Sequence, residues 1–306
     1  MFVVCGEALI DLVPAGPPAT WRAAYGGGPT NTAVALARLG TPTALVCRLS
    51  GDNFGRQLRE YLANNGVDLR LAVAASEPTT LAVVAFDERG GPDYQFYVNG
   101  TADWQWSAHE LPDDLPPGTL GLHIGSLASI LPPGAAVLRE WITAHRADTT
   151  VIYDVNVRPA LLPERETYRR EVRAWLDAAH VVKASVDDLD WLYPGEDALD
   201  VARRWIDEHD LSLVLVTAGP DGAVAVPCGQ DPVRAAGIPV DVADTVGAGD
   251  TFTAAFLHRV GLPAGISDRA SLAEALRFAV AAAALACTRE GAQPPTLDEV
   301  EDLLAR

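Results

Sequence analysis

The chain alternates between short apolar runs and longer segments in which apolar residues recur with helical spacing. Continuous apolar strands separated by helices are typical of a parallel sheet that is covered on both faces. We therefore predict an α/β fold, a three-layer αβα sandwich with a mostly parallel central sheet. The expected strands lie at residues 2–5, 43–48, 120–124, 150–153, 180–183 and 213–217, and the first helices at 30–39 and 54–64.

Two stretches break this alternation. Residues 12–25 are rich in Pro and Ala and show no helical period, and two strand-like runs, 80–86 and 94–98, flank a Gly-Gly-Pro step at 90–92 that is typical of a hairpin. We predict a small antiparallel β lid on the main body. A single domain over 1–306 is expected, with the lid formed by about 12–25 and 76–104.

The overall composition is that of a soluble globular protein, with 49% hydrophobic and 21% charged residues. The longest apolar runs, such as 278–286, are too short to span a bilayer, and the N-terminus lacks the features of a signal peptide. We expect a cytoplasmic protein that does not bind a membrane. The cysteines have no metal-ligand spacing, and we expect buried thiols at Cys5, Cys47, Cys228 and Cys287.

The net charge of -18, from 41 acidic and 23 basic residues, disfavours nucleic acid as a partner because the surface repels phosphate backbones. It does not exclude a small anionic ligand, since backbone N–H groups can form a local anion site. The chain has one lysine, Lys183, and no P-loop sequence. Any nucleoside triphosphate must therefore be bound by another motif.

The most informative segment is the turn Gly247-Ala248-Gly249, which runs directly into the helical pattern that contains Asp250. Glycines allow close backbone approach, and the free N–H groups of a helix start can hold a transferring phosphoryl group. At that position the helix dipole favours an ionised carboxylate, which can take a proton from an attacking alcohol. Taken alone, the Gly-Ala-Gly turn favours a glycine turn with an Asp helix cap over a phosphate site.

A second glycine-rich turn, Gly26-Gly27-Gly28, precedes Asn31 at the start of a helical pattern. Glycines leave room for a sugar, and the Asn31 amide can both donate to and accept from hydroxyls, although Asn is also a common helix cap. Asp11 follows the first strand, and ligands bind at strand ends in parallel sheets. Its carboxylate either accepts hydrogen bonds from vicinal hydroxyls or is simply solvated.

Taken whole, residues 244–250 and 26–40 resemble the two signatures of the ribokinase family, the PfkB-type sugar kinases, and most closely its fructokinase-like members. The resemblance implies ATP-dependent phosphorylation of a primary hydroxyl of a neutral sugar, with fructose the leading acceptor. It implies Asp250 as general base and an anion hole made by Gly247, Ala248 and Gly249. It assigns the sugar to Asp11, Gly27, Gly28 and Asn31.

The resemblance continues through the middle of the chain and implies ATP and Mg²⁺ as cofactors, with K⁺ as a weaker expectation. The run at 154–159 is similar to a fructokinase-like Asp-x-Asn-x-Arg-Pro segment, which adds Asn156 and Arg158 to the sugar side. Ser185 and Asp188 depart from the family's Asn and Glu in a magnesium-positioning segment. The nucleotide is assigned to Lys183, Ser185, Thr217, Gly219 and Gly222, and the metal ions to Asp188 and Asp244.

Residues 96–104 resemble the lid segment of the fructokinase-like members and assign Phe96 to the substrate. Val98 stands where these members commonly carry Arg, and losing that guanidinium removes a bidentate partner for a carboxylate. A neutral sugar is therefore favoured over 2-keto-3-deoxygluconate. The aromatic residues Phe96, Tyr97, Trp104 and Trp106 either cover the substrate or pack within the lid.

Two other functions stay open. One is a nucleoside or aminoimidazole riboside kinase. The other is a catalytically inactive ligand-binding relative, which retention of Asp250 and of the full glycine turn disfavours, because a pure binder needs no base. By resemblance, a homodimer would form through the lid.

Overall fold

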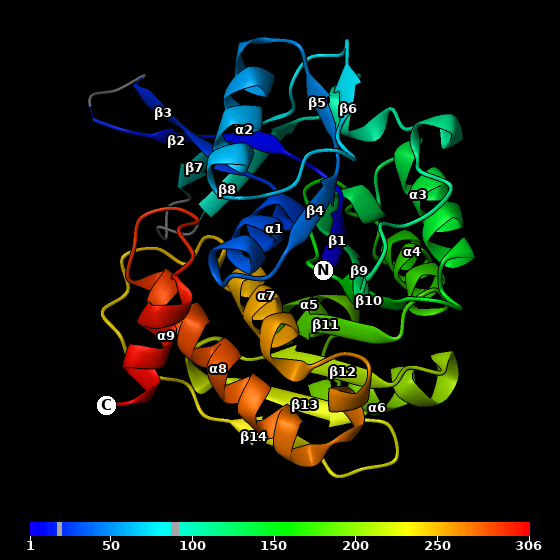
Figure 1. Ribbon diagram of the computed structural model, residues 1–306, viewed down its shortest axis with the longest axis vertical. Coiled ribbons are helices and arrows are strands. Elements are labelled where there is room, and N and C mark those ends of the chain that lie inside the picture. Colours follow the sequence, from blue (N-terminus) through cyan, green and yellow to red (C-terminus); the bar gives the residue numbers. More distant parts are fainter. Residues whose placement is uncertain (17–19, 87–91) are drawn as a thin grey trace.

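The computed structural model describes residues 1–16, 20–86 and 92–306, so most of the predicted Gly-Gly-Pro hairpin step lies outside the described residues. Its main sheet has the strand order β14-β13-β12-β11-β10-β9-β1-β4 (Figure 1). These strands are β1 (Phe2–Cys5), β4 (Thr43–Val46), β9 (Gly121–Gly125), β10 (Thr150–Asp154), β11 (Val181–Ser185), β12 (Leu213–Thr217), β13 (Ala223–Pro227) and β14 (Val233–Ala235). From β4 to β12 all neighbours are parallel, whereas β13 and β14 pair antiparallel at one edge.

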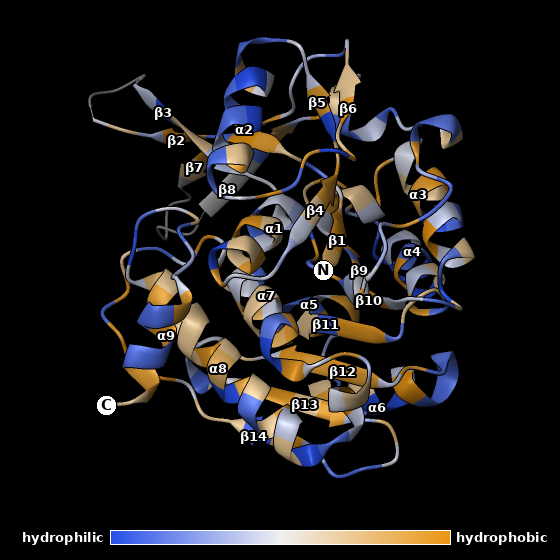
Figure 2. Ribbon diagram, in the orientation of Figure 1, coloured by the Kyte–Doolittle hydropathy of each residue, from blue (hydrophilic) through white to orange (hydrophobic). Residues whose placement is uncertain are grey.

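Helices cover both faces of this sheet, and the strands between them carry the apolar colouring in Figure 2. One core contains residues of α1 (Gly28–Arg38), α2 (Asn53–Asn64), α7 (Ala248–Val260), α8 (Arg269–Cys287) and α9 (Leu297–Leu304). The opposite core contains residues of α3 (Gly134–Ala144), α4 (Arg165–Leu176), α5 (Val186–Leu192) and α6 (Ala198–His209). The predicted α/β sandwich with a mostly parallel sheet is thereby confirmed.

Helix α8 is long and apolar enough to cross a membrane by length and composition alone, and within the described residues it is the single helix of this kind. Half of its apolar window is buried inside the protein, and its Leu272, Leu276 and Phe278 belong to the first core. It also packs along α7. These contacts account for its composition as that of a core helix.

A smaller sheet projects from the main body, with the strand order β3-β2-β7-β8 (Figure 1). Its strands are β2 (Leu9–Pro14), β3 (Trp21–Gly26), β7 (Leu81–Phe86) and β8 (Pro92–Tyr97). The expectation of an antiparallel patch is wrong in one respect, because β2 and β7 pair in parallel. The chain between them crosses through α1, β4 and α2, so β7 re-enters the sheet in the same direction as β2.

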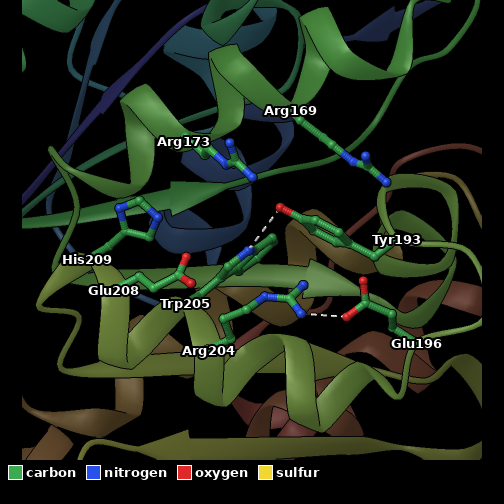
Figure 3. Close-up of a pocket in the computed structure, with 8 residues that line it drawn as sticks. All are labelled: Arg169, Arg173, Tyr193, Glu196, Arg204, Trp205, Glu208 and His209. Carbon is green, nitrogen blue, oxygen red and sulfur yellow. Dashed lines mark hydrogen bonds and ion pairs between the residues drawn. The ribbon is translucent and has the colours of Figure 1, made fainter.

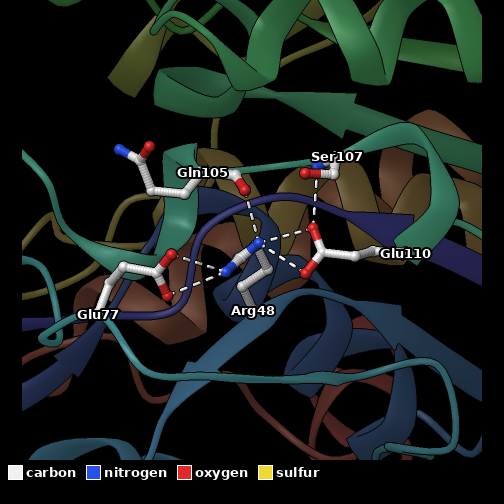
Figure 4. A network of polar contacts seen from close by, with 5 residues as sticks. All are labelled: Arg48, Glu77, Gln105, Ser107 and Glu110. Atoms are coloured by element: carbon white, nitrogen blue, oxygen red, sulfur yellow. Dashed lines mark hydrogen bonds and ion pairs between the residues drawn. The ribbon is translucent and has the colours of Figure 1, made fainter.

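The predicted strand at 43–48 is divided in the structure. Residues 43–46 form β4, and Arg48–Ser50 forms β5, which pairs with β6 (Val73–Ala75) in a separate two-stranded sheet. The buried Arg48 guanidinium donates to Glu77 (3.0 Å to Oε2), to Glu110 (2.6 Å to Oε2) and to the Gln105 carbonyl (Figure 4). This network joins β5 to Glu77, between β6 and β7, and to Gln105 and Glu110, in the segment of 3-10 turns that follows β8.

Two further expectations can be compared with side-chain burial. Trp104 and Trp106 are buried within the second core, where both lie against the start of α3, whereas Tyr97 is half exposed. Cys5 and Cys47 are buried as expected, but Cys228 is exposed and Cys287 is partly exposed. The expectation of buried thiols fails at Cys228 because it follows β13 in a surface loop.

Candidate active site

Residues far apart in the sequence meet where the N-termini of α1 and α7 face the carboxyl ends of the parallel strands. Gly28 lies at the centre of this meeting point. A Cβ atom added there would lie 3.3 Å from Asp250 Oδ1, 3.2 Å from Asn156 Nδ2 and 3.2 Å from the Ser126 Cβ. The two glycine-rich turns of the sequence are therefore neighbours in one site.

Neither Asn31 nor Asp250 is a helix cap. Helix α1 is capped by Gly27, and the Asn31 amide, in its first turn, donates to Asp250 Oδ2 at 2.9 Å. Helix α7 is capped by Gly247, and Asp250 is its third residue. The capping interpretations of both motifs are wrong, and the hydrogen bond between the two side chains fixes the orientation of the carboxylate.

Asp250 is a stronger base than its position at a helix start predicts. Burial and the Asp154 carboxylate raise its pKa to about 6, although the Asn31 hydrogen bond and the charges of Lys183 and Arg158 oppose the rise. At neutral pH the carboxylate is still predominantly ionised. Its pKa lies near the operating pH, which is the range that suits a general base.

The turn before Asp250 needs its two glycines for different reasons. Gly247 has φ 74, and a Cβ there would lie 2.7 Å from the Cβ of Ala292. Gly249 has no positive φ, but a Cβ there would lie 3.1 Å from Lys183 Nζ. The lysine side chain thus reaches the turn at the N-terminus of α7, where the free backbone N–H groups also lie.

Lys183 is a buried cation in this site. Burial lowers its pKa, but the carboxylates of Asp154, Asp188 and Asp250 outweigh burial and raise it above the ordinary value. The ammonium lies 3.2 Å from Asp154 Oδ1. Lys183 therefore stays protonated, and its ammonium lies beside the turn at the N-terminus of α7 while it is paired with Asp154.

Asp154 and Thr253 are site residues that the sequence analysis did not select. Asp154 accepts from Lys183, and the single hydroxyl proton of Thr253 is shared between Asp154 (3.3 Å) and the Gly249 carbonyl (3.1 Å). The sequence held a signal for each. Asp154 begins the Asp-x-Asn-x-Arg-Pro run, and Thr253 follows Asp250 by three positions, which places both on one face of α7.

Asp11 and Arg158 act electrostatically on the same site. Burial raises the pKa of Asp11 to about 7, the Arg158 charge opposes this rise and Asp250 adds to it. The strand register aligns Asp11 with Ala82 and Ala82 with Phe96, so Phe96 shares a sheet face with Asp11. Val98, two residues beyond Phe96, is half-buried.

The two predicted metal residues both use their carboxylates to hold backbone. Asp188 accepts from the N–H groups of Val157 and Ser185, each at 2.8 Å. Asp244 accepts from those of Val246 (3.0 Å) and Gly291 (2.8 Å). No group of three or more His, Cys, Asp or Glu side chains that could hold a metal ion occurs in the described part of the chain. A direct carboxylate cage is therefore absent there, and a divalent ion would be held through water and phosphate oxygens.

The predicted nucleotide residues follow the next strand of the sheet. Thr217 ends β12 and is aligned with Ser185 at the end of β11. Gly219 and Gly222 have φ 52 and 94, and a Cβ at Gly222 would lie 2.1 Å from the Ala235 carbonyl. These residues thus lie at or beyond the carboxyl end of β12, beside the carboxyl end of β11, the strand that contains Lys183.

A cavity of about 290 Å³ lies elsewhere, between α4, α5 and α6 (Figure 3). None of the predicted site residues lines it. Arg169 pairs with Glu166, Arg204 with Glu196, and both guanidinium groups lie over the Tyr193 ring. The charges of Arg169 and Arg204 are thus paired within the protein.

Residues 1–299 match the pfkB family of carbohydrate kinases. The chain belongs to the pfkB carbohydrate kinase family. It is 36% identical over 324 residues to Fructokinase-1 of Oryza sativa subsp. japonica, covering 99% of this chain and 96% of the relative. This kinase is fructokinase-like, and its family uses ATP to phosphorylate sugars.

Solved structures agree with this membership. A fructokinase from Xylella fastidiosa with bound ATP has a TM-score of 0.90 and 31% identity, covering 99% of this chain and 98% of that one. A Vibrio cholerae O395 fructokinase with fructose, ADP and calcium ion has a TM-score of 0.88, 28% identity and coverages of 99% and 98%. An aminoimidazole riboside kinase from Salmonella enterica, complexed with aminoimidazole riboside and an ATP analogue, has a TM-score of 0.85, 26% identity and 99% coverage of both chains.

Proposed function

We propose that this kinase transfers the γ-phosphoryl group of ATP to a primary hydroxyl of a neutral sugar, fructose first, with Asp250 as general base. The observation that carries the proposal is the Asp250 carboxylate, oriented by Asn31 and placed beside the N-terminus of α7 and Lys183. Asp250 takes the hydroxyl proton, the sugar oxygen attacks the γ-phosphorus, and the bond to the β–γ bridging oxygen breaks. ADP leaves with that electron pair.

The transferred group is stabilised by the N–H groups of the Gly247–Gly249 turn and by the Lys183 ammonium. One ammonium cannot neutralise a triphosphate, so a bound Mg²⁺ would supply further positive charge, and Asp188 would hold it through water. We assign Asp244 to a K⁺ site with less support, where it would hold the backbone of Val246 and Gly291 beside the ion. Thr217, Gly219, Gly222 and Ser185 bind the nucleotide along the neighbouring strand ends.

The sugar lies between the smaller sheet, which acts as the lid of a single domain, and the glycine turn. We assign it to Asp11, Gly27, Gly28, Asn31, Phe96, Asn156 and Arg158. Asp11 and Asp250 place two carboxylates near the acceptor, and Arg158 already interacts with both. A substrate carboxylate would be desolvated without a free cationic partner, so a neutral polyol is favoured.

A homodimer through the lid stays a proposal that rests on the family resemblance. Trp21 and Tyr97, on the two edge strands of the smaller sheet, are 45% and 52% exposed, but Ile10 and Leu12, which lie between them on the same face, pack against the first core. The two rings therefore do not form one exposed patch. We place the enzyme in the cytoplasm, although one relative is named a chloroplastic fructokinase.

A nucleoside acceptor is the second candidate, because the aminoimidazole riboside kinase has nearly the same fold over the whole chain. An ADP-release screen against ketohexoses, pentoses, sugar acids and nucleosides distinguishes the two. We expect fructose to give the highest kcat/KM and excess chelator to abolish turnover. A nucleoside as best acceptor would favour the second candidate, no active acceptor would favour a binding protein, and full activity in chelator would refute the divalent ion.

A further inference from the structure

Glu7 is a fully buried carboxylate beneath the sugar side of the site, and neither the sequence motifs nor the mechanism above uses it. It follows β1 in the short connection to β2. Its two oxygens hold separate parts of the chain. Oε1 accepts from the Gly28 N–H at 3.3 Å, and Oε2 accepts from the Ala128 N–H at 3.1 Å.

These two N–H groups belong to segments that meet at Asp250. Gly28 is the first residue of α1, and Ala128 lies in a 3-10 helix, η3 (Ser126–Ser129). A Cβ at Gly28 would touch both Ser126 and Asp250. A side chain that holds Gly28 to η3 therefore sets where the sugar-side backbone lies relative to the general base.

The backbone of Glu7 also contacts the sugar-side turn closely. Its carbonyl accepts from Thr30 Oγ1 at 2.8 Å, and a Cβ at Gly27 would lie 2.6 Å from that same carbonyl. A Cβ at Gly6 would lie 2.4 Å from Pro29 Cγ. Gly27 in the sugar-side turn and Gly6 before Glu7 thus allow these two segments to approach each other closely.

We propose that Glu7 is a positioning residue for the acceptor sugar, whose carboxylate ties Gly28 to Ala128 and so fixes the sugar pocket against Asp250. The inference rests on the proposed function, because it takes Gly28 and Asn31 as sugar residues. Burial is the main cause that raises the pKa of Glu7 to about 7, and the Asp103 carboxylate adds to it. The N–H groups of Glu7 itself and of Ala128, together with the Ser126 hydroxyl, oppose the rise because they favour the anion.

Glu7→Gln is the decisive variant, because the amide is nearly isosteric but can accept at only one of the two positions. We expect the sugar KM to rise at least tenfold, the ATP KM to stay within twofold and kcat to fall less than fivefold. Glu7→Asp keeps the charge but is one methylene too short to span both N–H groups, so its sugar KM should be intermediate.

Asp103→Asn is the matched control. Asp103 is equally buried, its pKa is also raised to about 7 by burial, and it accepts from the N–H of Ala8, the residue next to Glu7. It does not hold the sugar-side turn. A purely structural role for both carboxylates predicts similar losses of Tm and similar kinetics, whereas positioning predicts that the sugar KM changes only in the Glu7 variants. An unchanged sugar KM in Glu7→Gln, or an equal rise in Asp103→Asn, would overturn the proposal.

Hydrogen exchange on the wild-type enzyme keeps the proposal testable if the Glu7 variants do not fold. The first N–H groups of a helix have no partner within the helix, so protection of Gly28 depends on Glu7. We expect the Gly28 and Ala128 amides to be protected and to become more so when the best acceptor from the screen is added. Exchange as fast as in a free peptide would contradict the proposal. A wild-type enzyme that phosphorylates no acceptor would instead refute the proposed function, and it would leave the exchange result for Glu7 intact.

Discussion

Among the described residues, the charged cluster around Arg48 and the charged cluster at the candidate active site are built in opposite ways. At the base of the smaller sheet, Arg48 bonds two carboxylates at close range (Figure 4). Backbone hydrogen bonding and the Arg48 charge lower the pKa of Glu77. At the candidate active site, burial raises the pKa of Asp11 to about 7 and that of Asp250 to about 6.

The difference shows that carboxylates in direct ion pairs support the structure, whereas a buried carboxylate without such a pair can act as a base. In the first cluster, the Arg48 guanidinium is held in direct ion pairs, and the Glu77 carboxylate is left weakly basic. Lys183 is paired with Asp154, and among the residues that the structure describes no cation makes a direct ion pair with Asp250, which remains basic enough to accept a proton. A buried carboxylate with a raised pKa near a phosphate-binding turn is the expected signature of a catalytic base.

The largest expected effect is that of removing the base. Asp250→Asn keeps the side-chain shape but cannot accept a proton, so kcat should fall by roughly two to four powers of ten while the ATP KM changes little. Steady-state kinetics with fructose measures this. Asp298→Asn is the control, because Asp298 is an exposed carboxylate in the first turn of α9. Turnover near the wild-type level in Asp250→Asn would remove the assignment.

The pH dependence should have opposite signs for activity and stability at Asp250. Activity needs the ionised form, so kcat/KM should fall about tenfold per pH unit below about 6. The raised pKa means that the folded state binds more protons than the unfolded state between about pH 4 and 6, so this group's contribution to stability falls as pH rises through that range. The pH–rate profile and the Tm difference between wild type and Asp250→Asn test both signs. A kcat/KM that stays flat from pH 7 to 5 would contradict the first.

Breaking the paired cluster should change stability and leave the chemistry intact. Arg48→Met leaves Glu77 and Glu110 without their cation, and we expect a loss of about 2–4 kcal/mol in the free energy of unfolding, reduced from a fully buried pair because both carboxylates are partly exposed. Arg203→Met, which breaks an exposed pair with Asp200, should cost less than about 1 kcal/mol. Urea unfolding measures both. A kcat change above threefold in folded Arg48→Met would show that the two clusters are coupled.

The smallest effect concerns acceptor choice. Val98→Arg introduces a guanidinium on the Phe96 side of β8, and it should raise kcat/KM for 2-keto-3-deoxygluconate relative to fructose by about three- to tenfold. Tyr97→Arg is the matched control, because neighbouring residues of a strand point to opposite faces. Competition assays with the two acceptors measure the ratio. Equal ratios in the two variants would mean that residue 98 does not face the acceptor.

Much of the fold followed from local pattern. Apolar runs and helical periods located six of the strands of the main sheet and its first helices, because burial on both faces requires continuous apolar sequence. The pattern did not identify β13 and β14, nor the parallel pairing of β2 with β7. Strand direction and neighbours depend on how the chain crosses between sheets, which no short window of sequence contains.

For the candidate site, the sequence by itself selected most of the residues to which we assign chemistry, since glycine turns, an amide and carboxylates at helix and strand ends are local features. Only the tertiary structure decided what they contact. Asn31 bonds a carboxylate 219 positions away, Lys183 pairs with Asp154, and Glu7 joins two segments of the sugar side. The raised pKa values of Asp11 and Asp250 arise in the same way, because burial and neighbouring charge are set by packing between distant segments.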